Sequence, residues 1–497
     1  MGHISLLLPH TLPPQARTAL ERASFAVAYD LSLLPVPMPS RVRIEDGCLQ
    51  LYHELSESGH VLVPWWLSNK WCRILESASV SNRPHPYRLL LELARGELHQ
   101  LRQHVEDWRA VGLQLPNDFY QALQETTRLF VTALCGDDAE QQDRVSQLVL
   151  EKCHRLRDQL VREFTGQMFE TRLHEEGRLA TYLAAQTNQP WGRTSHLYLQ
   201  ACNSAHLSVT WRQVEQTEGR LCWQDWDVSI TEAEQQGVPI TAGPLIDLSV
   251  AALPEWLLVH RGDLPTLAAL MCDYVESVIQ RYHQRIKRWL VIAGFNLADP
   301  LGLDDDQRLR LAQRLLTAAT QVDPQGQFGV RIAQPWGDYL RDKDSTISPL
   351  MFADDLLRSG LTLGWVDLEI RFGPLARASF SRDLLDTIRM ISLYEILAVP
   401  LGITLALPAD VSNTHALASS DGTSSLFFSP WGPEDQAEWG DALTALVLAL
   451  PQVQAVTWEC WQDKPATDAA PLGLLDAQGQ PRPLFHRWKH LRSLYVQ

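Results

Sequence analysis

The chain has 497 residues, which is too long for one typical domain of roughly 100–200 residues. Hydrophobic residues make up 45% and charged residues 21%, a balance that excludes a disordered or fibrous chain. Because 59 acidic residues outnumber 43 basic ones, the formal charge is -16, which disfavours nucleic acid and anionic membranes as partners.

Targeting, cofactor and metal signals are absent from the sequence. No run reaches the roughly 20 apolar residues of a membrane-spanning helix, and residues 1–14 lack the basic region and cleavage site of a secretory signal. We therefore expect a cytoplasmic protein without membrane association. The eight cysteines show no C-x-x-C spacing, and no glycine-rich phosphate loop is present. We expect no metal and no cofactor, and the sequence does not set the oligomeric state.

Residues 1–83 predict a small β-rich domain. Residues 42–45 and 49–52 alternate in hydrophobicity around Asp46-Gly47, which is typical of a two-residue hairpin turn. Residues 61–66 predict another strand that Pro64 ends. A cluster with two prolines at residues 79–86 indicates a boundary.

Residues 84–170 predict a helical hairpin or small bundle. Apolar residues recur at three- and four-residue spacing in three successive stripes, beginning with Leu91, Leu98, Leu101 and Val105. Residues 115–117 and 136–138 separate the stripes and carry typical helix-end residues.

Residues 171–497 predict an α/β fold of the (β/α)8 TIM-barrel type. Short apolar runs alternate with amphipathic helical stretches about eight times, as expected of parallel strands joined by helices. The expected strands cover residues 180–183, 204–211, 238–242, 289–293, 329–333, 365–370, 401–407 and 453–458.

A motif near the second expected strand carries a family resemblance. From Val209 the chain reads V-T-W-R-Q-V-E-Q-T-E-G-R-L-C-W-Q-D-W-D to Asp227, which closely resembles the K-W-x-x-I-E-P-x-x-G-x-F-x-W-x-x-A-D signature of the glycoside hydrolase family 10 xylanases. Further similar segments follow in the family's order at residues 253–257, 456–463 and 473–483. The resemblance spans about residues 173–497. It implies a retaining hydrolase of β-1,4-xylan that uses two glutamates.

The family's catalytic positions are altered in this chain. Where the family has its acid/base glutamate after the fourth strand, the alignment places Gly294, and at the nucleophile it places Leu405. The third-strand histidines of the family are also replaced. The family's mechanism therefore cannot be carried over unchanged.

Polar and aromatic residues nevertheless follow several expected strands, where barrel enzymes carry their chemistry. Alternation places Glu369 and Arg371 on one face of the sixth strand, and Glu459 follows the eighth. Glu369 and Glu459 are candidates for a relocated catalytic pair. Candidates for sugar binding are Trp211, Asp247, Asn296, Gln334, Trp336, Arg371, Trp461 and Asp463.

Three functional hypotheses remain open. The first is a xylanase-related barrel that recognises a β-linked oligo- or polysaccharide with altered or lost catalytic residues. The second is an active glycosidase that uses Glu369 and Glu459. The third is a non-catalytic scaffold or interaction protein. Whether the protein is an enzyme is thus undecided by sequence.

Overall fold

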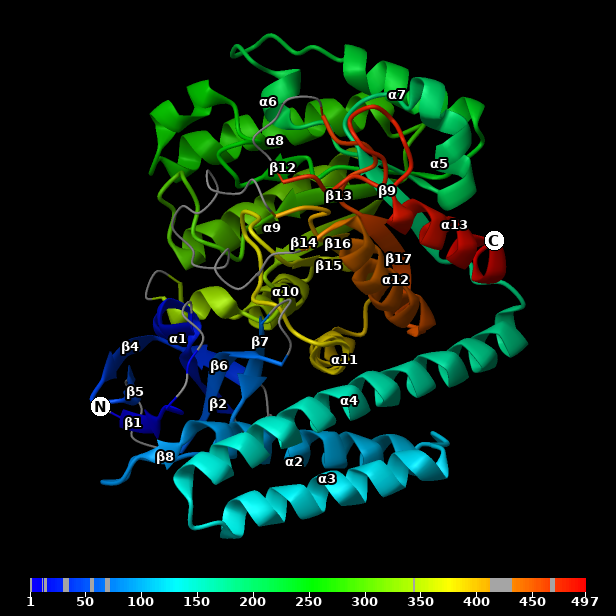
Figure 1. The fold of residues 1–497 in the computed structure, drawn as a ribbon. Coiled ribbons are helices and arrows are strands. Elements are labelled where there is room, and N and C mark those ends of the chain that lie inside the picture. Colours follow the sequence, from blue (N-terminus) through cyan, green and yellow to red (C-terminus); the bar gives the residue numbers. More distant parts are fainter. Residues whose placement is uncertain are drawn as a thin grey trace.

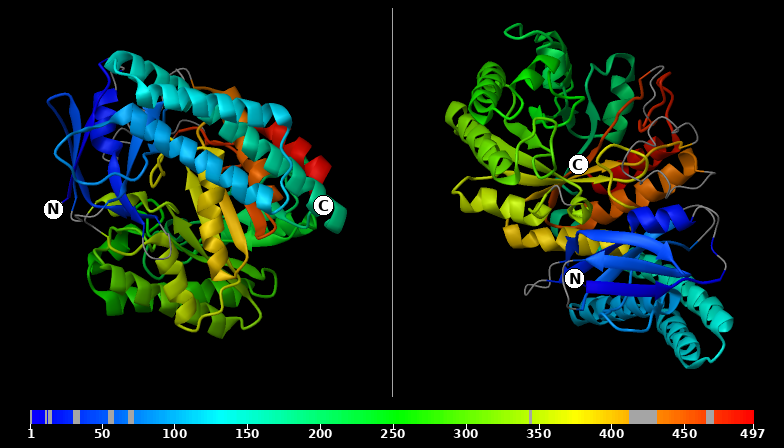
Figure 2. Two further views of the ribbon diagram at one scale, coloured as in Figure 1. Left: turned by 90° about the horizontal axis from the view of Figure 1, so that it is seen from below. Right: turned by 90° about the vertical axis from the view of Figure 1, so that its left-hand side faces the viewer.

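The computed structural model describes residues 2–10, 12, 16–29, 35–53, 58–67, 72–342, 345–411, 431–464 and 470–497. These residues form a β-rich N-terminal part, three long helices and a closed barrel (Figure 1). The barrel occupies the C-terminal part of the chain, and the N-terminal strands lie at its side (Figure 2).

Two four-stranded sheets make up the β-rich part. One has the strand order β4-β5-β1-β8 and the other β3-β2-β6-β7. The predicted hairpin is confirmed, because Asp46 and Gly47 both have positive φ (49° and 72°) between β4 and β5. The elements are β1 (Gly2–Leu7), α1 (Ala16–Ala23), β2 (Phe25–Tyr29), β3 (Pro35–Met38), β4 (Ser40–Glu45), β5 (Cys48–His53), β6 (His60–Trp66), β7 (Cys72–Glu76) and β8 (Tyr87–Arg88).

The prediction that Pro64 ends its strand is wrong, because β6 continues through it to Trp66. Residues 60–62 of β6 pair with β2, whereas Pro64 itself is paired only with Ile74 of β7. At Pro64 the edge of β6 that faces β2 is therefore no longer hydrogen-bonded to it. The missing N–H of proline costs no hydrogen bond on that edge.

The helical segment consists of α2 (Leu89–Ala110), α3 (Asn117–Cys135) and α4 (Ala139–Glu176). The three predicted stripes and both predicted breaks are confirmed. Asp138 caps α4 by accepting the N–H of Gln141 at 2.9 Å. Helix α4 runs alongside α11 (Leu384–Leu393) and α12 (Pro433–Ala449) of the barrel (Figure 1). The buried Arg172 on α4 donates to the carbonyls of Leu448 and Leu450 at the end of α12.

Eight parallel strand positions close into the predicted barrel. The sheet runs β11-β10-β9-β17-β16-β15-β14-β13-β12, and an additional pairing of β11 with β13 closes it. The strands are β9 (Tyr182–Thr187), β10 (Ala205–Leu207), β11 (Ile240–Ala242), β12 (Ile246–Asp247), β13 (Arg288–Ala293), β14 (Gln327–Ala333), β15 (Trp365–Arg371), β16 (Leu401–Ala406) and β17 (Val453–Trp458).

The third barrel position is split between β11 and β12. Gly243 lies in the break with φ 124°, and a Cβ atom at this position would collide with the carbonyl oxygen of Leu290. Only glycine fits so close to the neighbouring strand. Asp247 is consequently the last residue of β12, whereas the sequence placed it after a continuous third strand.

Helices cover the outside of the barrel. They are α5 (Ser195–Ala201), α6 (Trp211–Val214), α7 (Gln224–Gln235), α8 (Leu264–Tyr282), α9 (Asp305–Val322), α10 (Pro349–Arg358), α11, α12 and α13 (Pro483–Tyr495). Short 3-10 turns lie at η1 (Gly192–Thr194), η2 (Glu255–His260), η3 (Asp338–Arg341) and η4 (Tyr394–Leu397). Within the described ranges, no helix is both long and apolar enough to span a bilayer.

Candidate functional site

The inward-facing side chains of the barrel strands can be identified from a small void at its centre. Ser204 and residues of six strands line this void, among them Arg288, Trp365, Asp367 and Thr457. Because side chains alternate along a strand, Glu369 and Arg371 on β15 and Glu459 after β17 point the same way as Asp367 and Thr457. Glu369 and Arg371 therefore face the interior toward the carboxyl ends of the strands, as alternation predicted, and Glu459 faces it from the end of β17.

A network of ion pairs joins these side chains. Arg331 on β14 donates to Asp367, with Nε 2.6 Å from Oδ2, and its Nη1 lies 3.9 Å from Oε1 of Glu369. Arg371 binds Glu459, with Nη2 2.7 Å from Oε1. The side chains of Arg331, Asp367, Glu369 and Arg371 thus line one side of the barrel interior. Glu459, which follows the eighth strand, contacts this group through Arg371.

Each of the two candidate glutamates keeps one carboxylate oxygen without a protein hydrogen-bond partner. Glu369 is 6% exposed, and its Oε2 is buried with no partner among the described residues. The same holds for Oε2 of Glu459 and Nε of Arg371. A buried polar atom without a partner raises the free energy of the site, so these atoms favour a ligand that brings hydroxyl donors and acceptors.

The electrostatic environment favours the protonated form of Glu459. Burial raises the pKa of the Glu459 carboxyl above its ordinary value, Arg371 opposes this shift, and the nearby Glu369 adds to it. Burial would lower the pKa of Arg371, but Glu459 and Glu369 outweigh it, so the guanidinium stays charged. The site therefore holds a fixed cation beside a carboxyl group with an increased affinity for a proton.

Gly294, at the position aligned with the family's acid/base glutamate, packs against the guanidinium of Arg377. A Cβ atom on Gly294 would lie 2.5 Å from Nη1 of Arg377. Arg377 in turn binds Asp247, with Nη1 2.8 Å from Oδ1. A side chain at residue 294 and the present position of Arg377 are mutually exclusive.

Leu405, at the position aligned with the family's nucleophile, faces away from the network. Its neighbour Thr404 is the inward residue of β16, because its hydroxyl donates to Asp367 and accepts from Arg331, both at 2.8 Å. Leu405 is 0% exposed and belongs to the apolar core. Neither Gly294 nor Leu405, the two positions aligned with the family's catalytic glutamates, carries a carboxylate.

Two of the predicted sugar-binding tryptophans lie in the interior. Trp211 is 2% exposed, stacks on Tyr274 and donates its indole N–H to Glu215 at 2.7 Å. Trp461 is 3% exposed and donates to the hydroxyl of Thr194 at 3.0 Å. Neither ring presents an open face for a sugar, so their contacts fit a structural role.

Asn296 and Asp463 are engaged with backbone groups. Asn296 is fully buried, donates to the carbonyl of Ala333 at 2.8 Å and accepts its N–H at 3.1 Å. Asp463 accepts the N–H groups of Leu472 and Gly473 and pairs with Arg482 at 2.6 Å. These contacts hold the segments after β13 and β17 in place.

Gln334 and Trp336 lie after β14. Gln334 has φ 47°, and its carbonyl accepts the N–H of Gly337 at 2.7 Å. Trp336 packs beside Phe372, and its ring lies under the guanidinium of Arg382, whose central carbon is 5.0 Å from the ring centroid. Trp336 also lines a separate cavity between the barrel and the N-terminal part.

Sequence reasoning did not find Arg331, Asp367 and Arg377. Arg331 and Asp367 are charged residues inside otherwise apolar strands, which is a usable signal, since such residues are seldom buried unless paired. Arg377 lies in the loop after β15, and its contact with Gly294 depends on the path of that loop.

Comparison with known proteins finds similarity to xylanases. No protein-family model matches the chain. Endo-1,4-beta-xylanase 3 of Hypocrea jecorina is 33% identical over 86 residues, and these cover 17% of this chain and 24% of the relative. The match thus spans about a quarter of the length of the curated relative.

Solved structures of xylanases are similar over a longer stretch. Xylanase 10B of Thermotoga maritima is 14% identical with a TM-score of 0.47, covering 63% of this chain and 95% of that chain. The Penicillium canescens endo-1,4-beta-xylanase is 14% identical with a TM-score of 0.48, covering 65% and 95%. The strand order shows that the C-terminal part of the chain is a closed (β/α)8 barrel, and over 86 residues the chain is similar to an endo-1,4-beta-xylanase.

Proposed function

We propose that the mouth of the barrel binds a β-linked oligo- or polysaccharide through Glu369, Arg371 and Glu459, without the two-glutamate hydrolysis of family 10. The observation that carries the proposal is the pair of buried glutamates that each hold one oxygen in or near an ion pair and one oxygen without a partner. Sugar hydroxyls both donate and accept hydrogen bonds, so they can satisfy both oxygens and the Nε of Arg371.

The loss of hydrolysis is supported by the aligned catalytic positions. Gly294 and Leu405 cannot donate a proton or attack a sugar, and the guanidinium of Arg377 fills the space beside Gly294. Asp247 and Arg377 would then contribute a second charged pair to the rim of the binding site.

An active glycosidase is the second candidate, and the raised pKa of Glu459 favours it. A raised pKa lets a carboxyl group retain its proton to higher pH, as a general acid must before it donates to a leaving group. Glu369 would then act as the base or the nucleophile.

Calorimetric titration with xylo-, cello- and manno-oligosaccharides tests the proposal. We expect saturable binding of one series and a loss of about tenfold to a hundredfold in affinity for Glu459→Gln, since it replaces one of the two carboxyl oxygens that would meet a sugar hydroxyl. Glu170→Gln, an exposed residue of α4, is the control and should bind like the parent. No binding by any series would refute the proposal.

Product analysis separates the two candidates. Incubation of the bound oligosaccharide with the parent protein should release no shorter sugars. Release that stops in both Glu369→Gln and Glu459→Gln would establish the glycosidase instead.

A further inference from the structure

A cavity of about 420 Å³ lies where the β-rich part, α2 and the barrel meet. Its walls come from β2, β3, β6 and β7, from α2, and from η3, α10, α11 and η4 of the barrel. Most of the lining is apolar and includes Phe25, Val27, Ile74, Trp108, Leu340 and Ile388. Small-molecule sites in proteins have this size and this predominantly apolar character.

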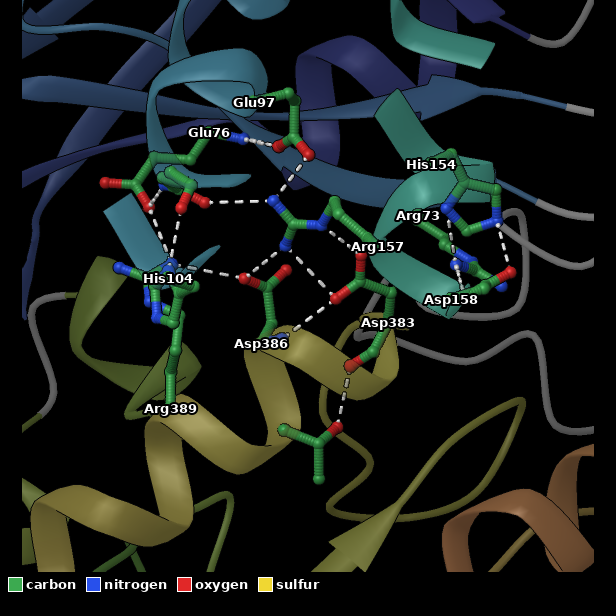
Figure 3. Close-up of polar contacts among 12 residues, drawn as sticks. Arg73, Glu76, Glu97, His104, His154, Arg157, Asp158, Asp383, Asp386 and Arg389 are labelled. Atoms are coloured by element: carbon green, nitrogen blue, oxygen red, sulfur yellow. Dashed lines mark hydrogen bonds and ion pairs between the residues drawn. The ribbon is translucent and has the colours of Figure 1, made fainter. Parts of the chain in front are cut away.

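One end of the cavity is charged. Glu76 from β7, His104 and Asp107 from α2, and Asp386 and Arg389 from α11 line it together. Figure 3 shows Glu76, His104, Asp386 and Arg389 gathered where α2 faces α11. Burial lowers the pKa of His104 to about 4, so its imidazole adds no positive charge near neutral pH.

The positive groups at this end are already shared among carboxylates. Nη1 of Arg389 lies 3.2 Å from Asp386 and 3.5 Å from Glu76. Arg382, the other arginine of the lining, is held by both carboxylate oxygens of Asp338 at 2.6 and 3.0 Å. Each guanidinium is thus committed to carboxylates that belong to the protein.

Behind the cavity the same shortage continues. Arg157 is 1% exposed and contacts three carboxylates, those of Glu97 at 2.8 Å, Asp383 at 2.5 Å and Asp386 at 2.9 Å. Burial raises the pKa of Glu97 to about 8, and the neighbouring Asp386 and Asp383 add to the shift. The pKa of Asp386 is raised for the same main reason. Arg389 and the buried Arg73 also act on Asp386, yet a deficit of positive charge remains, and protonation of Glu97 relieves it.

We propose that this cavity binds a small apolar molecule that carries a protonated amine, with the amine at the Glu76, Asp107 and Asp386 end and the hydrocarbon against the apolar walls. An ammonium group supplies the positive charge that the carboxylates lack, whereas an anionic head group would meet three of them. The hydrocarbon would be removed from water by the aromatic and aliphatic walls. This site is separate from the carbohydrate site proposed at the barrel mouth and does not depend on it.

Three probes that differ only in their head group test this inference. They are 4-phenylbutylamine, 4-phenylbutan-1-ol and 4-phenylbutanoate, each titrated calorimetrically into the full-length protein at neutral pH. We expect the amine to bind about tenfold tighter than the alcohol, the carboxylate to bind most weakly, and the amine to raise the Tm most. Equal affinities for the three probes, or no saturable binding of the amine, would overturn the inference.

Two variants locate the binding. Asp107→Asn removes an exposed carboxylate of the cavity rim and should weaken the amine but not the alcohol. Glu106→Gln removes the same charge one residue away on α2, outside the lining, and should leave both unchanged. Leu350→Trp narrows the cavity from α10 and should weaken both probes. If Leu350→Trp leaves the affinity for both probes unchanged, the amine binds elsewhere and the inference fails. The same holds if Asp107→Asn and Glu106→Gln have equal affinity for the amine.

Discussion

Gly294 and Arg377 pack tightly against each other at the barrel mouth. Gly294 has φ 74°, and the guanidinium of Arg377 occupies the direction in which a side chain would project. Arg377 itself has φ 58° and is held by Asp247. A left-handed backbone costs a residue with a Cβ atom roughly 1–2 kcal/mol, and the contact adds to this cost.

Gly294→Ala is therefore expected to lower the free energy of unfolding by more than the cost of the left-handed backbone conformation alone. The added methyl group must displace the guanidinium of Arg377 from Asp247. Chemical unfolding measures the loss. Gly360→Ala is the matched control, because Gly360 has φ 87° and no atom near its Cβ position. In an Arg377→Ala background, Gly294→Ala should lower the free energy of unfolding no more than Gly360→Ala does. A larger loss in that background would show that the contact with Arg377 is not the cause.

Part of the candidate site could be predicted from the sequence. Glu369 and Arg371 followed from strand alternation, and Glu459 followed from its place after an aligned strand; the structure brings all three to one side of the barrel interior. Their roles remain predictions. Asn296, Trp461 and Asp463 had the same sequence signal, yet they bind backbone or neighbouring side chains, since a polar residue near a strand end can serve either purpose.

At the scale of elements, predictability follows the range of the interactions. The helices α2, α3 and α4 were predicted because their apolar spacing is a local property. Strands β1, β2, β3, β7 and β8 were not predicted. They are two to six residues long, and some of them pair with residues far away in sequence, as Leu6 does with Tyr87. Strand propensity depends on such partners more than helix propensity does.

Gly96 shows how closely two elements approach. It lies inside α2, where a Cβ atom would collide with the backbone of Glu76 and Ser77 at the end of β7. Alanine normally stabilises a helix interior relative to glycine by roughly 0.5–1 kcal/mol. Gly96→Ala is expected to reverse this sign and destabilise the protein by about 1–3 kcal/mol, because backbone cannot move aside as a side chain can.

Gly166→Ala is the control for Gly96→Ala. Gly166 lies inside α4 with no atom near its Cβ position, so alanine should stabilise the protein there. Both values come from chemical unfolding monitored by far-ultraviolet circular dichroism. Changes of the same sign in the two variants would show that the contact between α2 and β7 is looser than described.

At the scale of the whole molecule, one apolar core and one ionic network connect the parts. The main apolar cluster contains residues of the β-rich part, the three long helices and the barrel. Arg157 on α4 joins Glu97 on α2 to Asp383 and Asp386 at the start of α11. The cavity proposed as an amine site lies beside this junction, because Asp386 also lines it. The protonation of the network should therefore influence the stability of the assembled chain.

Glu97 gives this influence a direction. Its pKa is raised from 4.5 in the unfolded chain to about 8 in the folded protein, so the folded state binds more protons between these values. Stability must then fall as pH rises through this window, by up to about 1.4 kcal/mol per pH unit. The buried His104 and His206, whose pKa values are lowered to about 4, change stability in the opposite sense, but only below about pH 6.5. Between about pH 7 and pH 8 the contribution of Glu97 should dominate.

Glu97→Gln tests this by removing the titrating group while keeping its size and its acceptor oxygen. We expect the free energy of unfolding of the parent to decrease from about pH 7 to about pH 8, and that of the variant to stay nearly constant. Above about pH 8 the variant should be more stable than the parent, because Arg157 then faces two carboxylates rather than three. Glu170→Gln on the exposed face of α4 should retain the parental slope. A parental slope in Glu97→Gln would mean that Glu97 is ionised in the folded protein across this range and that Arg157 alone compensates the carboxylates around it.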